Sequence, residues 1–215
     1  MMLTITNEDN MQLMARYKDK HFDLAIVDPP YGIGKDWEKR NKGKKHESTS
    51  YENESIPDEN YFKELVRVSK NQIIWGYNYY TQYLGSTNYL ICWDKQSNNN
   101  DVFMYSNFEL AYTSMKKPAR LVSIPWDGYR MGSETGKSKI HPHQKPINLY
   151  KWVLEKYAND GDKILDTHLG SGSIAIACHD YGFDLTACEL DEYHYKRTMK
   201  RINNHTAQQL LNLKQ

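Results

Sequence analysis

The stretch that decides the fold is FDLAIVDPPY, residues 22–31. Apart from Asp23, its first six residues are apolar, and the run stops at a carboxylate, two prolines and an aromatic ring. Such a run is typical of a buried parallel strand whose polar end lies at the carboxyl edge of a sheet, where α/β folds bind ligands. The prolines fix φ and remove donors, so Asp28 and the Pro29 carbonyl form a rigid set of acceptors that suits an amino group. A turn that merely ends a strand is the other reading.

Predicted strands and helices alternate on both sides of this stretch. The expected strands cover residues 2–6, 22–27, 72–75, 88–93, 108–114, 163–167 and 183–188, with 108–114 antiparallel to 88–93. The expected helices run from a cap at Asn7 or Asp9 to about 17, then over 58–68, 147–157, 174–182 and 191–203, with a polar tail from 208. Residues 2–28 outline a right-handed β-α-β unit. This alternation predicts an α/β fold with a mostly parallel, twisted sheet flanked by helices.

Two long connections lack apolar periodicity, residues 32–57 and residues 116–140. Connections of this length are uncommon inside a compact domain unless they act as lids or binding loops. Six basic side chains fall between positions 35 and 45 against Asp36 and Glu38, and such local basic patches suit a polyanion. We therefore expect these two segments to contact a binding partner.

Length and composition limit the class of protein. A chain of 215 residues is long enough for one well-cored domain, which we place at 1–215. Hydrophobic content of 39% and a mean hydropathy of −0.82 are low, but 17 tyrosines indicate a globular protein with an amphipathic surface. No apolar run approaches the roughly 20 residues that span a bilayer, and the N-terminus lacks a signal pattern, so a cytoplasmic protein is expected. The scattered Cys92, Cys178 and Cys188 argue against disulfides and zinc.

A second motif lies late in the chain. A predicted strand leads into Gly170-x-Gly172-x-x-Ala175, a helix follows, and the next strand ends on Glu189. Glycines allow close backbone approach to a ligand at a helix N-terminus, and an acid about 20 residues on can accept ribose hydroxyls. A nucleotide-like ligand is predicted, with NAD as one alternative. Only 26 residues follow Glu189, too few to complete a dinucleotide fold, so the N-terminal part must supply the remaining strands.

Three motifs in order carry a family resemblance: DPPY at 28–31, HPHQKP at 141–146 and LDTHLGSGS at 165–173. Together they resemble the β-group amino DNA methyltransferases, which methylate adenine N6 or cytosine N4, and the short chain is similar to the phage or prophage members. WGYNY at 75–79 and WDK at 93–95 also resemble family segments near the target base. The resemblance spans most of the chain. It implies a Rossmann-like methyltransferase fold with circularly permuted motif order, S-adenosylmethionine as cofactor, double-stranded DNA as partner, and a homodimer.

The resemblance also assigns site residues. It implies that Asp28 and Pro29 accept hydrogens from an exocyclic amine, and that Pro30 and Tyr31 complete the catalytic set, with Tyr31 stacking on a flipped base. It implies a cofactor site formed by Asp166, His168, Gly170, Ser171, Gly172, Glu189, Gln144 and Lys145, in which Lys145 could pair with the methionyl carboxylate. His168 stands where the family commonly has Phe, and Thr167 where Pro is common. No metal is expected.

The chemistry then narrows to amines, with several alternatives open. Methylation at cytosine C5 is disfavoured because it needs a thiolate nucleophile, and the three cysteines lie in predicted strands or a helix. A tetrapeptide that begins with Asp favours adenine N6 in this family, with cytosine N4 as the alternative, followed by an RNA or protein amide. An NAD oxidoreductase and a non-catalytic nucleic-acid-binding module are the readings from other classes. Trp75 and Tyr77 are candidate stacking partners, although core packing is slightly favoured for both.

Overall fold

The computed structural model describes residues 1–32, 55–96, 106–126, 131–136 and 138–212. Its strands are β1 (Leu3–Asn7), β2 (Phe22–Val27), β3 (Ser69–Trp75), β4 (Leu90–Asp94), β5 (Phe108–Thr113), β6 (Arg120–Ser123), β7 (Lys163–Asp166) and β8 (Asp184–Glu189). Its α-helices are α1 (Asn10–Ala15), α3 (Glu59–Val68), α4 (Thr81–Leu84), α5 (Ile147–Tyr157), α6 (Ser173–Tyr181) and α7 (Glu192–Asn212). Two short 3-10 helices are η2 (Tyr77–Tyr79) and η3 (Gly132–Glu134).

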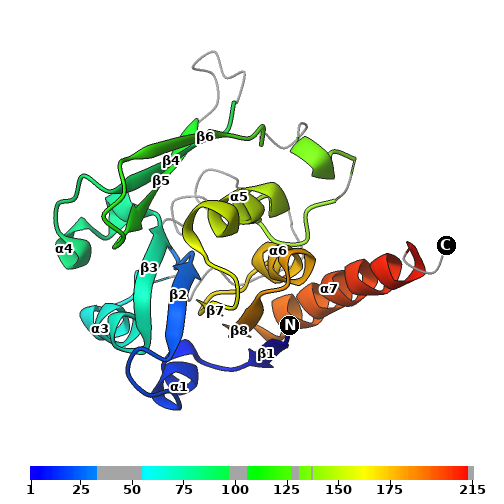
Figure 1. Cartoon of the computed structure of the whole chain (residues 1–215), viewed down its shortest axis with the longest axis horizontal. Helices are drawn as coiled ribbons and strands as arrows, with labels where there is room; N and C mark the ends of the chain where they lie inside the picture. Colours follow the sequence, from blue (N-terminus) through cyan, green and yellow to red (C-terminus); the bar gives the residue numbers. More distant parts are fainter. Residues whose placement is uncertain (33–54, 97–105, 127–130, 137, 213–215) are drawn as a thin grey trace, which may run out of the picture.

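The described strands form one eight-stranded sheet in the order β1-β8-β7-β2-β3-β5-β4-β6 (Figure 1). The strands from β1 to β3 in this order are parallel, β5 is antiparallel to both β3 and β4, and β6 is parallel to β4. The early strand β2 pairs with the late strand β7, with Leu24 opposite Ile164. The strand that leads to Asp28 therefore lies beside the strand that ends at Asp166.

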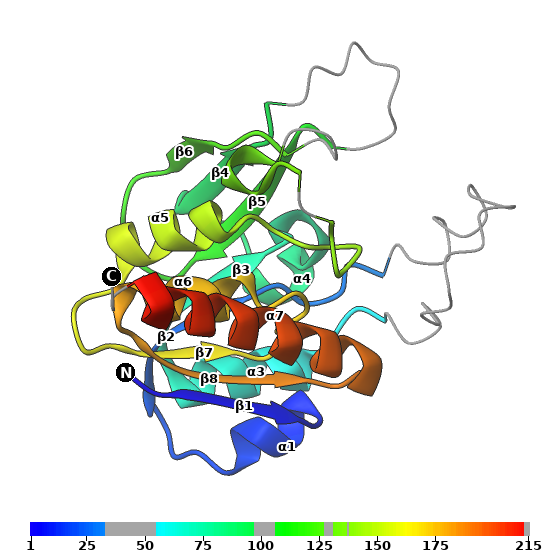
Figure 2. The same cartoon turned by 90° about the vertical axis from the view of Figure 1, so that its right-hand side faces the viewer.

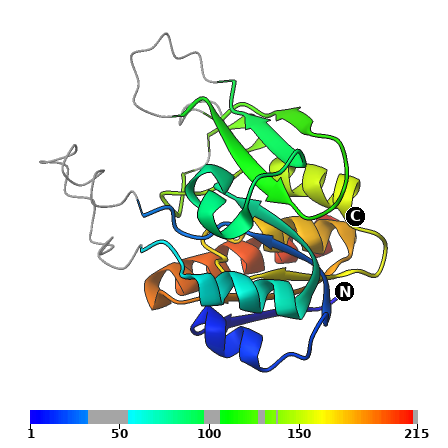
Figure 3. The same cartoon turned by 90° about the vertical axis from the view of Figure 1, so that its left-hand side faces the viewer.

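Strand β2 is buried on both faces, as its apolar sequence predicts. Leu24 and Ile26 belong to one hydrophobic cluster, and Ala25 and Val27 belong to the cluster on the other side of the sheet. Helices α5, α6 and α7 cover the first face (Figure 2), and α1 and α3 cover the second (Figure 3). The result is the predicted α/β architecture, in which the site-bearing strand is central.

Local signals place the helices on the second face. The Asp9 carboxylate accepts hydrogen bonds from the backbone N–H groups of Met11 and Gln12 and caps α1. The Asp58 carboxylate caps α3 by accepting from Tyr61 N at 3.1 Å. Of the two predicted caps, Asn7 and Asp9, the structure uses Asp9.

Two sequence predictions about elements are wrong. Strand β6 lies inside the segment 116–140 that was expected to be a loop; it has four residues, and Val122 is buried while Leu121 is 65% exposed, which is too short a pattern to detect. Helix α7 continues to Asn212 instead of ending near 203, because the Ala-, Gln- and Leu-rich sequence there favours a helix. The predicted β-α-β unit does place β1 and β2 parallel, with β8 and β7 between them.

The two predicted binding segments are only partly described. Residues 33–54 of the segment 32–57 lie outside the described residues, as do 127–130 and 137 of the segment 116–140. In the part of the chain that the structure describes, no helix has both the length and the apolar sequence needed to span a membrane.

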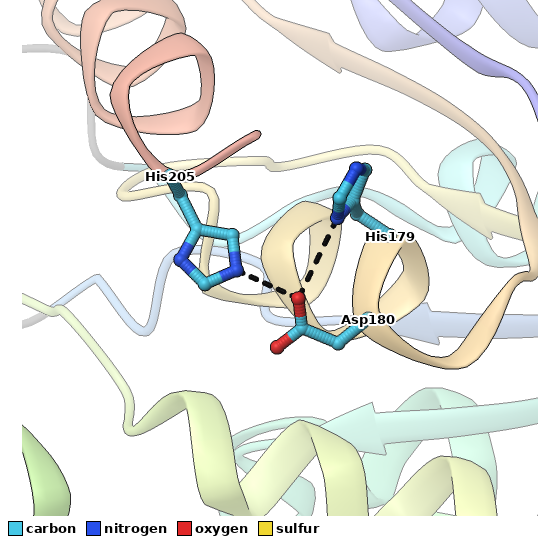
Figure 4. Close-up of side chains that lie close together, drawn as sticks. All are labelled: His179, Asp180 and His205. Carbon is cyan, nitrogen blue, oxygen red and sulfur yellow. Dashed lines mark hydrogen bonds and ion pairs between the residues drawn. The ribbon is translucent and has the colours of Figure 1, made fainter. Parts of the chain in front are cut away.

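A polar cluster links the three helices of the first face at the end of α6 (Figure 4). Asp180 Oδ1 accepts a hydrogen bond from His205 Nε2 of α7 at 2.6 Å and lies 3.5 Å from His179 Nδ1. Its Oδ2 pairs with Lys151 Nζ of α5 at 2.5 Å. Burial would raise the pKa of Asp180, but the bonds to Lys151 and His205 outweigh burial and lower it to about 2. The atoms of His179, Asp180 and His205 that could bind a metal ion lie within 4.8 Å of one another. The ammonium of Lys151, however, already balances the charge of the Asp180 carboxylate. We interpret the cluster as a link between helices.

Candidate active site

The carboxyl ends of β2, β7 and β8 open into one cavity of about 630 Å³. Its walls come from segments far apart in sequence that the parallel register brings to the same edge of the sheet. The predicted site residues that line it are Asp28, Pro29, Pro30, Tyr31, Lys145, His168, Gly170, Ser171 and Glu189. The other three, Gln144, Asp166 and Gly172, are buried and do not line it. The sequence motifs therefore converge on one site.

The Asp28 carboxylate is occupied on both oxygens. Tyr31 donates its hydroxyl to Oδ1 at 2.6 Å, and Lys145 Nζ donates to Oδ2. Lys145 Nζ also lies 3.1 Å from the Tyr31 hydroxyl. Burial raises the pKa of Tyr31 well above its ordinary value, so its hydroxyl acts as a donor at neutral pH.

A second carboxylate, Glu109 of β5, completes this group and was missed by sequence reasoning. Its Oε2 lies 3.0 Å from Lys145 Nζ and accepts from the Tyr31 hydroxyl at 3.3 Å, and its Oε1 pairs with Lys95 Nζ at 2.6 Å. Burial would raise the pKa of Glu109, but Lys145 and Lys95 outweigh burial and lower it to about 2. The available signal was one charged residue inside the apolar strand FELAYT, opposite Trp93.

The ammonium of Lys145 stays charged although its side chain is only 4% exposed. Burial would lower the pKa of Lys145, yet the neighbouring carboxylates of Asp28 and Glu109 raise it. The sequence predicted Lys145 as a cofactor ligand, and it does line the cavity. Its ammonium is held by Asp28 and Glu109, while a pairing with a methionyl carboxylate stays a prediction.

Tyrosines surround the proline pair. Tyr80 donates its hydroxyl to the carbonyls of Pro29 at 2.6 Å and Pro30 at 2.9 Å, which fixes the turn. Tyr79, 37% exposed, stacks on Tyr31 with ring centroids 4.8 Å apart and an interplanar angle of 11°. Tyr79 belongs to the segment 75–79 that resembles family segments near the target base, whereas Tyr80 was not singled out from sequence.

The two aromatics that were singled out, Trp75 and Tyr77, pack elsewhere. Trp75 is fully buried, with its ring edge-on to Trp93 at 6.3 Å. Tyr77 stacks on Tyr112 and donates its hydroxyl to Gly85 O at 2.8 Å. Packing, which the sequence slightly favoured, is the role the structure gives both.

The Gly-rich loop is held from two sides. Gly170 N donates to Glu189 Oε2 at 2.9 Å, and the Gly170 carbonyl accepts from the Thr198 hydroxyl of α7. Arg201, also from α7, donates to the Ser171 carbonyl at 2.7 Å. Gly172 begins α6 with φ of +73°, and a Cβ there would lie 2.6 Å from Thr198 Cγ2. Gly172 is thus required both by its backbone conformation and by its contact with α7.

Asp166 is buried and His168 is partly buried at the end of β7. Asp166 accepts from the backbone N–H of His168 at 3.0 Å, and burial raises its pKa to about 8. The His168 ring lies edge-on to Tyr61 at 5.3 Å, and its Nε2 is 3.0 Å from Asn10 Nδ2. Burial lowers the pKa of His168 to about 4, so the ring is neutral and packs like the aromatic residue common in the family.

Gln144 has its own partners. Its side chain donates to Glu134 Oε2 at 3.2 Å and accepts from Ile140 N at 3.0 Å. Glu134 also pairs with Arg201 at 2.6 Å. Gln144 therefore braces the segment that carries Lys145, and a direct cofactor contact stays a prediction.

The charge of the cavity wall suits a cationic ligand. Carboxylates outnumber lysines in the described lining, which contains Lys145. The carboxylates are those of Glu8, Asp28, Asp58, Glu189, Asp191 and Glu192. S-adenosylmethionine carries a sulfonium and an ammonium group, whereas NAD carries a pyrophosphate that this wall would repel. His194 also lines the cavity, is 8% exposed, and its Nδ1 has no hydrogen-bond partner among the described residues. The residues present therefore fit S-adenosylmethionine better than NAD.

The fold and the cavity thus define the class of Rossmann-like methyltransferases that use S-adenosylmethionine. A family model described as DNA methylase, for N6 and N4 methyltransferases, matches residues 59–200. The chain therefore belongs to this DNA methylase family and is a DNA methyltransferase dependent on S-adenosylmethionine.

Individual relatives agree with this assignment. The type II methyltransferase M.HpaI of Haemophilus parainfluenzae is 20% identical, and the match covers 90% of this chain and 72% of the relative. The M1.HpyAVI–SAM complex has a TM-score of 0.62 at 16% identity and covers 94% of this chain and 100% of its own. The PvuII DNA methyltransferase, which is cytosine-N4-specific, has a TM-score of 0.62 at 10% identity, with 95% and 91% covered. The two structures establish the shared fold.

Proposed function

We propose that the protein methylates the exocyclic N6 amine of a flipped adenine in duplex DNA. The observation that carries the proposal is the position of Asp28 and the Pro29 carbonyl, which share one acid-lined cavity with the Gly-rich loop. Asp28, Pro29, Pro30 and Tyr31 are the proposed catalytic set. The choice of adenine over cytosine rests on the Asp that begins this tetrapeptide.

The proposed chemistry is amine activation by fixed acceptors. The amine lone pair is delocalised into the base, and acceptors that hold its hydrogens out of the ring plane concentrate density on nitrogen. Asp28 and the Pro29 carbonyl would hold these hydrogens, and the carboxylate would stabilise the positive charge on nitrogen until a proton leaves. When bound, S-adenosylmethionine supplies the methyl group, and its sulfur takes the electron pair of the broken carbon–sulfur bond.

The cofactor half of the site is proposed from the Gly-rich loop and the strand ends beside it. Gly170 and Ser171 would approach the methionyl part, and Glu189 would accept the ribose hydroxyls. Asp166, Gly172 and Gln144 would act from behind the wall, through the backbone that they hold. His168 would form an apolar, neutral part of the pocket.

The base must leave the duplex to reach Asp28, because its amine is inaccessible inside the stack. Tyr31 is the proposed stacking partner, and the exposed ring of Tyr79 is a second, since it already lies parallel to Tyr31. Residues 32–57 and 116–140 are proposed to contact DNA. We also propose a homodimer, which light scattering would test; a monomer mass with and without DNA would contradict it.

The test identifies the modified nucleoside. Unmethylated bacterial genomic DNA is incubated with the protein and methyl-labelled S-adenosylmethionine, digested, and chromatographed. We expect labelled N6-methyl-2′-deoxyadenosine, and N4-methyl-2′-deoxycytidine alone would overturn the choice of base. Asp28→Ala should lower incorporation by at least about 100-fold, and unchanged incorporation would overturn the role of Asp28. A melting temperature that S-adenosylmethionine raises and NAD does not would exclude the NAD oxidoreductase alternative.

A further inference from the structure

Both groups that occupy Asp28 also contact one other atom, Glu109 Oε2. The Tyr31 hydroxyl lies 2.6 Å from Asp28 Oδ1 and 3.3 Å from Glu109 Oε2. Lys145 Nζ donates to Asp28 Oδ2 and lies 3.0 Å from the same Glu109 oxygen. The two carboxylates therefore share both donors.

This sharing matters because the proposed function needs the Asp28 oxygens for the amine of the base. In this structure both oxygens already accept hydrogen bonds. Breaking these bonds without a substitute would leave a buried ammonium and a buried hydroxyl short of acceptors, which is costly. The amine can displace them at low cost only if another acceptor is within reach.

We propose that Glu109 is a positioning residue that takes over the Tyr31 hydroxyl and the Lys145 ammonium when the target amine binds Asp28. The inference rests on the proposed function and deepens it. Only small movements are required, because both donors already lie within 3.3 Å of the receiving oxygen. Lys95 holds the other oxygen of Glu109 at 2.6 Å, so Oε2 stays directed at the shared donors.

Charge supports the same exchange. Asp28 and Glu109 carry two negative charges, and Lys145 and Lys95 carry two positive charges, all on side chains that are at most 19% exposed. As the nitrogen lone pair forms the new bond to the methyl carbon, positive charge develops on the nitrogen beside Asp28. A Lys145 ammonium that remained on Asp28 would oppose that charge, whereas one transferred to Glu109 is balanced there. The proton then leaves the nitrogen through Asp28 to water, and Glu109 neither gains nor loses a proton.

The central variant is Glu109→Gln, which keeps the shape of the side chain and removes its charge. We expect single-turnover methylation of unmethylated genomic DNA to slow about 10- to 100-fold, with the Kd for S-adenosylmethionine unchanged. The matched control is Glu64→Gln, since Glu64 pairs with Arg67 on α3 outside the cavity and should leave the rate unchanged. A wild-type rate for Glu109→Gln would overturn the proposal.

A double variant tests whether Glu109 takes over the two donors from Asp28 or only supports the local structure. Tyr31→Phe keeps the ring and removes one of the competing donors, so it should raise the rate when added to Glu109→Gln but not when made alone. If the effects of the two substitutions on the methylation rate simply multiply, the proposed transfer of donors from Asp28 to Glu109 is contradicted. Should Glu109→Gln fail to fold, Glu109→Asp decides: its shortened carboxylate cannot keep both contacts, so an intermediate rate is expected and a wild-type rate would overturn the proposal.

The outcomes distinguish this inference from the proposed function. If the wild-type protein yields no methylated amine on any base, the proposed function fails. If the wild type is active and Asp28→Ala is inactive while Glu109→Gln keeps its rate, only the exchange fails.

Discussion

At the scale of single residues, the buried ionisable groups behave differently according to their partners. Glu109 has two ammonium groups beside it and a pKa lowered to about 2. Asp166, which is more deeply buried, accepts a backbone N–H group and lies near the negative charges of Asp28 and Glu189, and burial raises its pKa to about 8. Burial acts on both carboxyl groups, and the neighbouring charges decide whether the pKa rises or falls.

Asp166 should make the protein less stable as the pH rises. An unfolded Asp has a pKa of about 3.9, so between that pH and about 8 the folded state binds more protons than the unfolded state. The free energy of unfolding therefore falls across this window. Asp166→Asn removes the titration, so in urea denaturation the variant should gain stability relative to the wild type as the pH rises from 5 to 8. If the free energies of unfolding of the two proteins change with pH in the same way, the raised pKa of the buried Asp166 carboxyl is contradicted.

Two glycines at the ends of α6 offer a matched comparison. Gly172 and Gly182 both have φ near +80°, at +73° and +80°, but only at Gly172 would a Cβ meet another element. Gly182→Ala should cost about 1–2 kcal/mol of backbone strain, and Gly172→Ala about 1–3 kcal/mol more, because Thr198 must move. Urea denaturation of both variants measures the difference. Equal losses would show that α7 does not press on the Gly-rich loop.

At the scale of elements, apolar pattern and flanking residues predicted most of the fold. Strand β2 and helix α5, over residues 147–157, were predicted with their observed bounds. The apolar run of β2 ends at Asp28 and the apolar stripe of α5 begins directly after Pro146, so the sequence marks both boundaries. Strand β6 was missed because its pairing with β4 decides it, a contact that four residues cannot encode. Glu109 was missed for a similar reason: its role comes from Lys145, which is distant in sequence.

The link between α6 and α7 should contribute measurably to stability. His205→Ala removes the hydrogen bond to the Asp180 carboxylate, which should cost about 1–3 kcal/mol for a bond to a charged group. His205→Gln can still donate to that carboxylate and should lose less. Chemical denaturation at constant pH checks both variants. Equal stability of His205→Ala and the wild type would mean that the cluster contributes nothing to the packing of α7.

At the scale of the whole molecule, the two halves of the site share one sheet and one core. Leu24 and Ile26 of β2 belong to the same hydrophobic cluster as Ile164 of β7 and the residues of α6. Strands β2 and β7, which lead to the proposed catalytic and cofactor residues, are thus coupled through packing, although their motifs come in permuted order along the chain.

The prediction of a single domain over 1–215 follows from this shared core. Calorimetry should show one transition whose calorimetric and van't Hoff enthalpies agree. S-adenosylmethionine should raise the midpoint of the entire transition, because it binds only the folded state. Two separate transitions, or a shift in one of two, would divide the chain into independent units.

The pairing of β1 with β8 has a consequence for biosynthesis. The hydrogen bond from Met2 N to Asp184 spans 182 residues, so β1, which is synthesised long before β8, finds its neighbour only when β8 has emerged. Contacts of such separation slow folding. Until then β1 is an unpaired strand exposed to other nascent chains. Translation that stalls before residue 184 should therefore leave an aggregation-prone intermediate, even though the tetrapeptide at residues 28–31 has already been made.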